Sequence, residues 1–298
     1  MNSPNPDSAV SPPAPALRPY IAHYAGFRAH GLPAGTHTGL PSRHVHLIIS
    51  LGPPIDVIQM PNAWQSPAAF RAMVCGLQDA PATIRVCGNL HGLHVFMTPL
   101  GARAILGVNS AELSSQVVNL SDIWGRTATR MTERLMAAST WQQRFEILDQ
   151  VFTRALRPVT TRRELAWAWS TIARTHGSLP IEKLARDLGW SRRHFGETFH
   201  AELGVAPKTA ARIFRFEHAC RLIMDQRPSL AHVAAECGFH DQAHMTREWN
   251  ALAGCTPGAW IAKELPILQD YEVSGGDNDV GERNANGSLY QSELQRSM

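Results

Sequence analysis

Two short stretches in the C-terminal third of the chain carry side chains that suit base recognition. Arginine can bond guanine in a bidentate manner, glutamine and asparagine can do the same with adenine, and the threonine methyl group can contact that of thymine. A glutamate can accept a hydrogen bond from the amino group of cytosine. The DNA contacts predicted on this basis are Arg192, Arg193 and Glu197 in the first stretch, and Gln242, Ala243, Thr246, Arg247 and Asn250 in the second. Taken alone, each stretch is also compatible with a solvated helix surface.

An internal repeat favours the DNA interpretation. The first half of the repeat recurs at an offset of 49 residues and, after one extra residue in the turn, the second half recurs at an offset of 50. The paired positions are Leu184/Val233, Ala185/Ala234, Gly189/Gly238, Trp190/Phe239, His194/His244, Phe195/Met245, Phe199/Trp249, Gly204/Gly254 and Pro207/Pro257. Apolar and turn positions agree in type while the polar positions differ, so we expect two similar folding units, the first unit (residues 184–207) and the second unit (residues 233–257).

The spacing within each unit predicts a helix, a tight turn and a second, capped helix. A small alanine lets two helices cross closely, and a glycine four residues later permits the turn between them. Ser191 and Asp241 stand where a side chain can accept hydrogen bonds from the free amides of the second helix. Apolar residues then recur on one helical face and must point inward. The predicted DNA contacts therefore occupy the outward face of each second helix.

Residues 181–260 resemble the C-terminal domain of the AraC/XylS family of transcriptional regulators. The residues that carry the resemblance are Gly204, Val205, Ala206, Pro207, Arg212, Arg215, Ala219, Leu222, Val233, Ala234, Gly238, Phe239, Met245, Arg247, Glu248, Trp249, Gly254, Cys255, Thr256 and Pro257. The resemblance implies a seven-helix domain in which one long helix joins the two units. It also implies that both recognition helices enter successive major-groove segments of double-stranded DNA, about 34 Å apart.

By position, the resemblance assigns base contacts to a subset of the same surface: Arg193, Gly196, Glu197, Gln242, Ala243, Thr246 and Arg247. The chain departs from the family pattern at two places. Gly196 offers no side chain to a base, and Ala210 stands where the family usually has an aromatic residue. The first unit therefore offers a base fewer side chains than the second.

The predicted fold class is α+β. We expect a disordered leader over residues 1–16, a β-rich sensor domain with helices over 17–156 and a linker over 157–163. An all-helical DNA-binding domain follows over 164–262, and an acidic, disordered tail over 266–298. Candidate strands lie at 44–51, 82–87 and 92–97, with a turn at Gly88 and Asn89 between the last two. Helical stripes at 131–138 and 141–155 are interpreted as core packing in preference to a dimer contact.

Four histidines in the N-terminal half raise the question of a metal site. His44 and His46 are alternate residues that would point the same way on a strand, and His91 and His94 lie on another candidate strand. Cupin enzymes use such a His-x-His strand together with a carboxylate, but no Asp or Glu occurs between residues 43 and 55. We therefore predict a structural or ligand-contact role, with no metal, no cofactor and no catalytic residue.

The bulk composition narrows the class of protein further. The chain has 298 residues, 44% of them hydrophobic, and a formal net charge of +3. This charge is too small to indicate a polyanionic partner, so DNA binding is predicted from the residue pattern alone. It contains no apolar run of membrane-spanning length and no secretory signal pattern at the N-terminus. The five cysteines show no CxxC pairing and are interpreted as reduced, buried thiols of a cytoplasmic protein.

The favoured function is therefore a sequence-specific transcriptional regulator that is not an enzyme. The weak resemblance of residues 17–156 to the cupin-like sensor half of such regulators implies a small-molecule effector, a homodimer, or both, and the family implies RNA polymerase as a partner. Two alternatives stay open. One is a DNA-binding regulator without an effector, and the other is an enzyme, metal-dependent and cupin-type or a cysteine methyl acceptor, fused to a DNA-binding domain.

Overall fold

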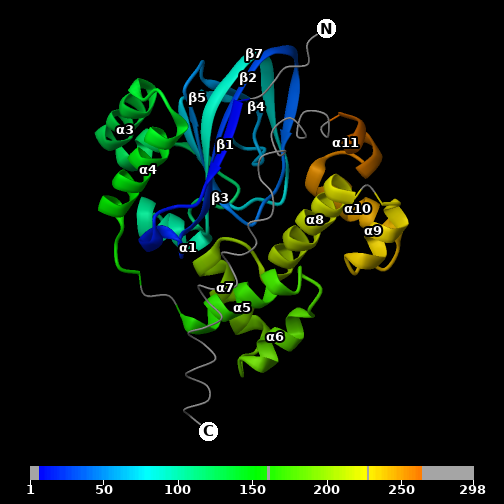
Figure 1. Cartoon of the computed structure of the whole chain (residues 1–298). Helices are drawn as coiled ribbons and strands as arrows, with labels where there is room; N and C mark the ends of the chain where they lie inside the picture. Colours follow the sequence, from blue (N-terminus) through cyan, green and yellow to red (C-terminus); the bar gives the residue numbers. More distant parts are fainter. Residues whose placement is uncertain (1–6, 160–161, 227, 264–298) are drawn as a thin grey trace.

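The computed structural model describes residues 7–159, 162–226 and 228–263, and these residues form a β domain followed by a helical domain (Figure 1). The predicted tail over 266–298 lies outside the described residues. The α+β prediction is confirmed. None of the helices in the described part of the chain has the length and apolar character needed to cross a membrane.

The β domain is built on one antiparallel sheet. Its strands are β1 (Asp7–Ser11), β2 (Ile21–Gly39), β3 (Val45–Ser50), β4 (Ile55–Gln59), β5 (Ala68–Phe70), β6 (Ala72–Cys75), β7 (Ala82–Met97) and β8 (Val117–Asn119). The hydrogen-bonded order is β1-β2-β7-β3-β6-β8, and β4 pairs with both β5 and β7. The long strand β7 thus pairs with β3 through its second half and with β4 through its first half.

The two faces of the sheet have different partners because side chains alternate along each strand. Val45, Leu47 and Ile49 of β3 are fully buried in one large hydrophobic core. Helices α3 (Arg126–Ala137) and α4 (Trp141–Ala155) contribute Leu135, Phe145, Leu148 and Phe152, among others, to the same core. These two stripes pack inside the domain, as the sequence pattern predicted.

Two expectations about the β domain are wrong. The leader does not extend to residue 16, because β1 pairs with β2 and the backbone N–H of Ala14 donates to Asp149 Oδ1 at 2.9 Å. Gly88 and Asn89 do not close a hairpin, because β7 runs through them. Gly88 has a φ of +72° and pairs with Leu32 at a shift in register between β2 and β7, so the glycine permits a bulge and not a chain reversal.

The remaining short helical elements of the β domain lie between strands or, in the case of α2, between β8 and α3. They are η1 (Pro15–Leu17), α1 (Pro99–Gly101), the π-helical turn η2 (Ala102–Leu106) and α2 (Leu120–Trp124). The Thr98 side chain caps α1 by accepting from the backbone N–H of Gly101. η2 is followed by Gly107, which has a φ of +78° and donates its backbone N–H to the Ala102 carbonyl at 3.1 Å.

The helical domain contains seven described helices, as the family resemblance implied. They are α5 (Arg163–Arg174), α6 (Ile181–Asp187), α7 (Arg192–Leu203), α8 (Pro207–Gln226), α9 (Leu230–Glu236), α10 (Gln242–Ala253) and α11 (Pro257–Lys263). In Figure 1, α5, α6 and α7 lie below the sheet, α9, α10 and α11 lie to its right, and α8 runs between the two groups. The first helix-turn-helix unit is α6 with α7, and the second is α9 with α10.

Candidate DNA interface

The two units have the same local geometry. Gly189 and Gly238, at the turns, have φ values of +69° and +70°. In each turn the N–H of the following aromatic residue donates to the carbonyl of the buried alanine: Trp190 to Ala185 and Phe239 to Ala234, both at 2.9 Å. A left-handed residue suits glycine because it has no Cβ, so the repeated glycines define the same turn twice.

Each second helix begins at the cap that the sequence predicted. The Ser191 hydroxyl accepts from the backbone N–H of His194 at 3.2 Å, and Asp241 Oδ1 accepts from that of His244 at 2.6 Å. The backbone hydrogen bond from His244, followed by the side-chain hydrogen bond with His240, lowers the pKa of Asp241 below its ordinary value. A negative charge at a helix N-terminus is also favoured by the helix dipole.

The inward faces of the second helices are those expected from the repeat. Phe195, Phe199 and Leu203 of α7 are buried, as are Met245, Trp249 and Leu252 of α10. Trp249 packs edge-on against Phe216 and Trp260, with ring centroids 4.8 and 5.4 Å apart. This packing fixes the rotation of each helix about its axis and so decides which side chains face outward.

The predicted DNA contacts lie on the outward faces. Arg192, Arg193, Glu197, Gln242, Ala243, Arg247 and Asn250 are exposed, and Gly196 and Thr246 are intermediate. The Thr246 hydroxyl donates to the Gln242 carbonyl at 2.9 Å, so toward a base it can offer its methyl group or accept a hydrogen bond at its oxygen. These positions are accessible, and their role in DNA contact stays a prediction.

The two outward faces differ in charge arrangement. On α7, Arg193 Nε pairs with Glu197 Oε1 at 2.8 Å, and Arg192 Nη2 lies 3.1 Å from Oε1 of Glu182 on α6. On α10, Glu248 points away from the outward face and pairs with Arg212 of α8. The predicted contact set of the first unit thus contains an ion pair, Arg193 with Glu197, whereas Arg247 of the second unit has its nearby carboxylate outside that set, at the cap residue Asp241.

The histidines of the β domain are brought together only in part. His23, His44, His46 and His94, here called the histidine cluster, gather on the sheet face opposite the large core, where Phe96 stacks with His23 and His94 at 4.1 and 4.0 Å. His94 Nε2 lies 2.6 Å from His46 Nδ1, so one imidazole donates to the other. His91 lies elsewhere, against Trp141 and Arg28.

The histidine cluster is electrically neutral near pH 7. Burial lowers the pKa of His46 to about 4, and burial together with the charge of Arg43 lowers that of His23 to about 4. Burial is also the main cause that holds the pKa values of His44 and His94 well below their ordinary value. Within the described ranges, no group of three or more His, Cys, Asp or Glu side chains is arranged to hold a metal ion.

The expectation that all five cysteines are buried holds for two of them. Cys220 and Cys237 are buried and Cys75 and Cys255 are intermediate, but Cys87 is exposed because it points outward from β7. Burial raises the pKa of the Cys75 thiol to about 12, so this thiol is a poor nucleophile near neutral pH.

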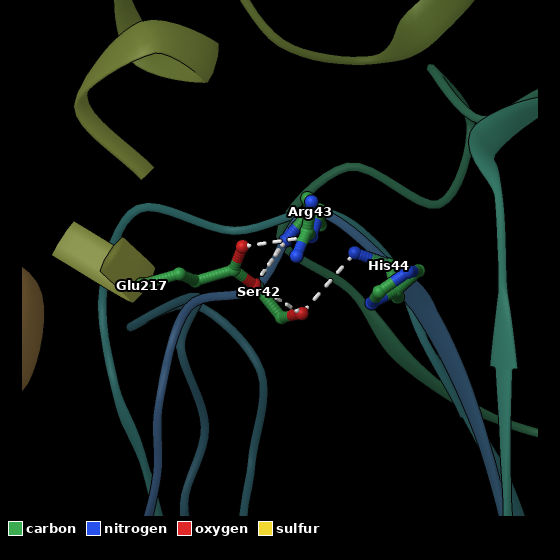
Figure 2. Close-up of polar contacts among 4 residues, drawn as sticks. All are labelled: Ser42, Arg43, His44 and Glu217. Atoms are coloured by element: carbon green, nitrogen blue, oxygen red, sulfur yellow. Dashed lines mark hydrogen bonds and ion pairs between the residues drawn. The ribbon is translucent and has the colours of Figure 1, made fainter. Parts of the chain in front are cut away.

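A contact between the two domains was missed by the sequence reasoning. Glu217 of α8 reaches the segment that leads into β3 and there contacts Ser42 and Arg43 (Figure 2). Ser42 Oγ and the backbone N–H of Arg43 both donate to Glu217 Oε1, at 2.8 and 2.9 Å. Arg43 Nε lies 3.1 Å from Glu217 Oε2, which is close enough for an ion pair although the atoms are not aligned for a hydrogen bond.

Comparison with known proteins agrees with this architecture. Residues 184–263 match the family model of a helix-turn-helix domain, and residues 9–119 match that of a domain of unknown function (DUF6597). The chain is 30% identical over 77 residues to the virulence regulon transcriptional activator VirF of Yersinia enterocolitica, covering 26% of this chain and 28% of VirF. It is 29% identical over 77 residues to the transcriptional regulator ExsA of Pseudomonas aeruginosa, with the same shares.

A likeness over most of the chain comes from a solved structure. ToxT from Vibrio cholerae superposes with a TM-score of 0.50 at 9% identity, over 87% of this chain and 98% of ToxT, which shows a shared fold. The sequence matches to VirF and ExsA, by contrast, span 28% of the length of each relative. The chain thus joins an antiparallel β domain to a tandem helix-turn-helix domain. That tandem domain is of the AraC/XylS type, which confirms the resemblance.

Proposed function

We propose that this protein is a transcriptional regulator that binds double-stranded DNA through both helix-turn-helix units. The observation that carries the proposal is the repetition of one capped, glycine-turned geometry that exposes a polar face on α7 and another on α10. In helix-turn-helix proteins the N-terminal residues of the second helix contact base edges in the major groove. The residues we assign to this role are Arg192, Arg193, Glu197, Gln242, Ala243, Thr246, Arg247 and Asn250.

Selection of bound duplexes from a random pool tests the proposal. We expect two contacted DNA segments about one helical turn apart, and an affinity that falls with salt because bound arginines displace counterions. Failure to enrich any sequence, together with an affinity that does not respond to salt, would contradict the proposal. A regulator bound at a promoter would act by recruiting or blocking RNA polymerase. The selected sequences also distinguish a monomer from a homodimer by the number of half-sites.

We further propose that a small-molecule effector contacts the histidine cluster. Four neutral imidazoles beside Phe96 offer hydrogen-bond donors and acceptors next to an aromatic face, which suits a small polar ligand with an apolar part. Thermal-shift screening of a metabolite panel tests this assignment. A ligand that stabilises the wild type should lose its effect in the His94→Phe variant but keep it in the variant of an exposed histidine, His232→Phe. Equal effects in both variants would place the effector elsewhere.

A further inference from the structure

The two helix-turn-helix units are attached to the β domain in different ways. One hydrophobic core runs from the sheet through α4 into the first unit and includes Leu47, Phe152, Phe195 and Phe199. The second unit has a core of its own, whose buried members come from α8 to α11. The first unit thus shares one close-packed interior with the β domain, whereas the second unit forms a second body around an interior of its own.

Helix α8 crosses from one core to the other within a single turn. Phe214 belongs to the core shared with the β domain, whereas Phe216 belongs to the core of the second unit and packs on Trp249. Glu217 is the next residue of α8 after Phe216. The contact of Glu217 with the β domain therefore lies at the point of α8 where the two bodies meet.

Residues 40–44, here called the strap, hold α8 at this point. Ser42 and Arg43 supply three contacts to Glu217, two hydrogen bonds and one ion pair, and the Arg43 guanidinium also lies over the Phe214 ring, 5.3 Å from its centroid. Leu40, at the start of the strap, packs against the core of the second unit. Only 16% and 18% of the Arg43 and Glu217 side-chain surfaces are exposed, so water screens this pair less than it would a surface pair.

The other end of the strap belongs to the histidine cluster. The backbone N–H of His44 donates to Ser42 Oγ at 3.2 Å, the same hydroxyl that donates to Glu217 (Figure 2). Arg43 is also close enough for its charge to act on His23 and His44. One hydroxyl and one guanidinium thus connect the histidine cluster with Glu217.

We propose that the β domain regulates the second helix-turn-helix unit and not the first, by way of the strap and Glu217. The first unit keeps its place on the β domain, and the strap sets the orientation of the second unit relative to it. A change at the histidine cluster would then alter the spacing of α7 and α10 by favouring one of two orientations. This inference rests on the proposed function for its biological meaning, but the attachment itself can be tested without DNA.

Hydrogen exchange measured by mass spectrometry separates the two units in the full chain. Glu217→Ala removes the contact to the strap, and Glu202→Ala is the matched control, since Glu202 of α7 also pairs with an arginine of the β domain, Arg103, at 2.7 Å. We expect exchange in α9 and α10 to rise about tenfold or more in Glu217→Ala, while α6 and α7 are unchanged. Glu202→Ala should alter neither unit, because the shared core holds the first one.

Equal acceleration of both units in Glu217→Ala, or none in either, would overturn the proposal. Should Glu217→Ala not fold, Glu217→Gln serves in its place, since its amide oxygen can still accept from Ser42 and Arg43 while the ion pair is lost. A smaller but still selective effect on α9 and α10 is then expected. These measurements contain no DNA, so their failure is distinguishable from a failure to bind DNA.

A second readout uses the selected DNA site. Insertion of one base pair between the two contacted segments should weaken wild-type binding more than it weakens binding of Glu217→Ala, because the released second unit can follow the displaced segment. The same insertion penalty in both proteins would refute the strap as the element that sets the spacing. Glu202→Ala, the control, should show the wild-type penalty.

Discussion

Three glycines with the same backbone conformation provide a sharp test of how the first unit is attached. Gly189, Gly204 and Gly254 have φ values of +69°, +84° and +69°. They differ in what surrounds them. A Cβ at Gly189 meets nothing within 4 Å, one at Gly254 would lie 3.3 Å from Pro81 Cγ, and one at Gly204 would lie 2.5 Å from the backbone oxygen of Ser110 in the β domain.

Alanine at each position should therefore carry a common cost and a specific one. The left-handed conformation costs an L-residue about 1–2 kcal/mol. Gly204→Ala should add about 1–3 kcal/mol for overpacking, because the obstructing atom is backbone and cannot rotate away. The hydrogen bond from Ser114 Oγ to the Gly204 carbonyl would be displaced as well, at the same interface.

Urea denaturation of the three variants measures these costs. We expect the loss in free energy of unfolding to follow the order Gly204, Gly254, Gly189, with Gly189→Ala reporting the backbone cost alone. The difference between Gly204→Ala and Gly189→Ala then isolates the contact between the domains. If these two variants lose the same stability, the first unit is not packed on the β domain as described.

Three further predictions concern the DNA interface and the histidine cluster. Arg247→Ala should weaken binding to a selected site by about 1–3 kcal/mol in a gel-shift titration and relax the preference at one base pair; unchanged binding would remove Arg247 from the base-reading set. Glu197→Gln should free the first recognition helix of a charge that repels phosphate and steepen the dependence of log affinity on log salt by up to about one unit, whereas Glu133→Gln on α3 should not. His46 stays neutral in the folded protein down to about pH 4, whereas in the unfolded chain the same imidazole takes up a proton near pH 6.5. The free energy of unfolding should therefore have its full value above pH 6.5 and fall between pH 6.5 and 4. His46→Gln should flatten this dependence in thermal unfolding and His232→Gln should not; identical pH profiles for the two would contradict the burial of His46.

The sequence predicted the tandem units well because the information in them is local. Helix, turn and cap are decided by residues within a few positions of one another, and the repeat places the same residue types at these positions in both units. The inward faces of α7 and α10 follow from a 3.6-residue period, so the period by itself places Phe199 and Trp249 in the interior, where both are buried. The fold class followed in the same way from the change of periodicity along the chain.

The predictions that failed depended on pairing between distant segments. The leader lacks any pattern of its own, and its strand exists because β2 offers an edge to Asp7–Ser11. Gly88 and Asn89 have the composition of a turn, but the residues of β7 before and after them both pair with β2, and Gly88 lies at a bulge. Burial of Cys87 was expected from residue type, whereas its exposure is set by which way β7 faces.

Residue order alone thus determined what the chain is made of: two helix-turn-helix units, each with a capped helix and an outward polar face, joined to a β-rich domain. Only the tertiary structure decided how they are connected. Glu217 is 174 residues from Arg43 along the chain, and nothing in the spacing of either residue indicates the other. Nor does local pattern reveal that Phe214 and Phe216, two positions apart, belong to different cores. The reason is physical: helices and turns form from neighbours in sequence, whereas cores and interdomain ion pairs form from neighbours in space.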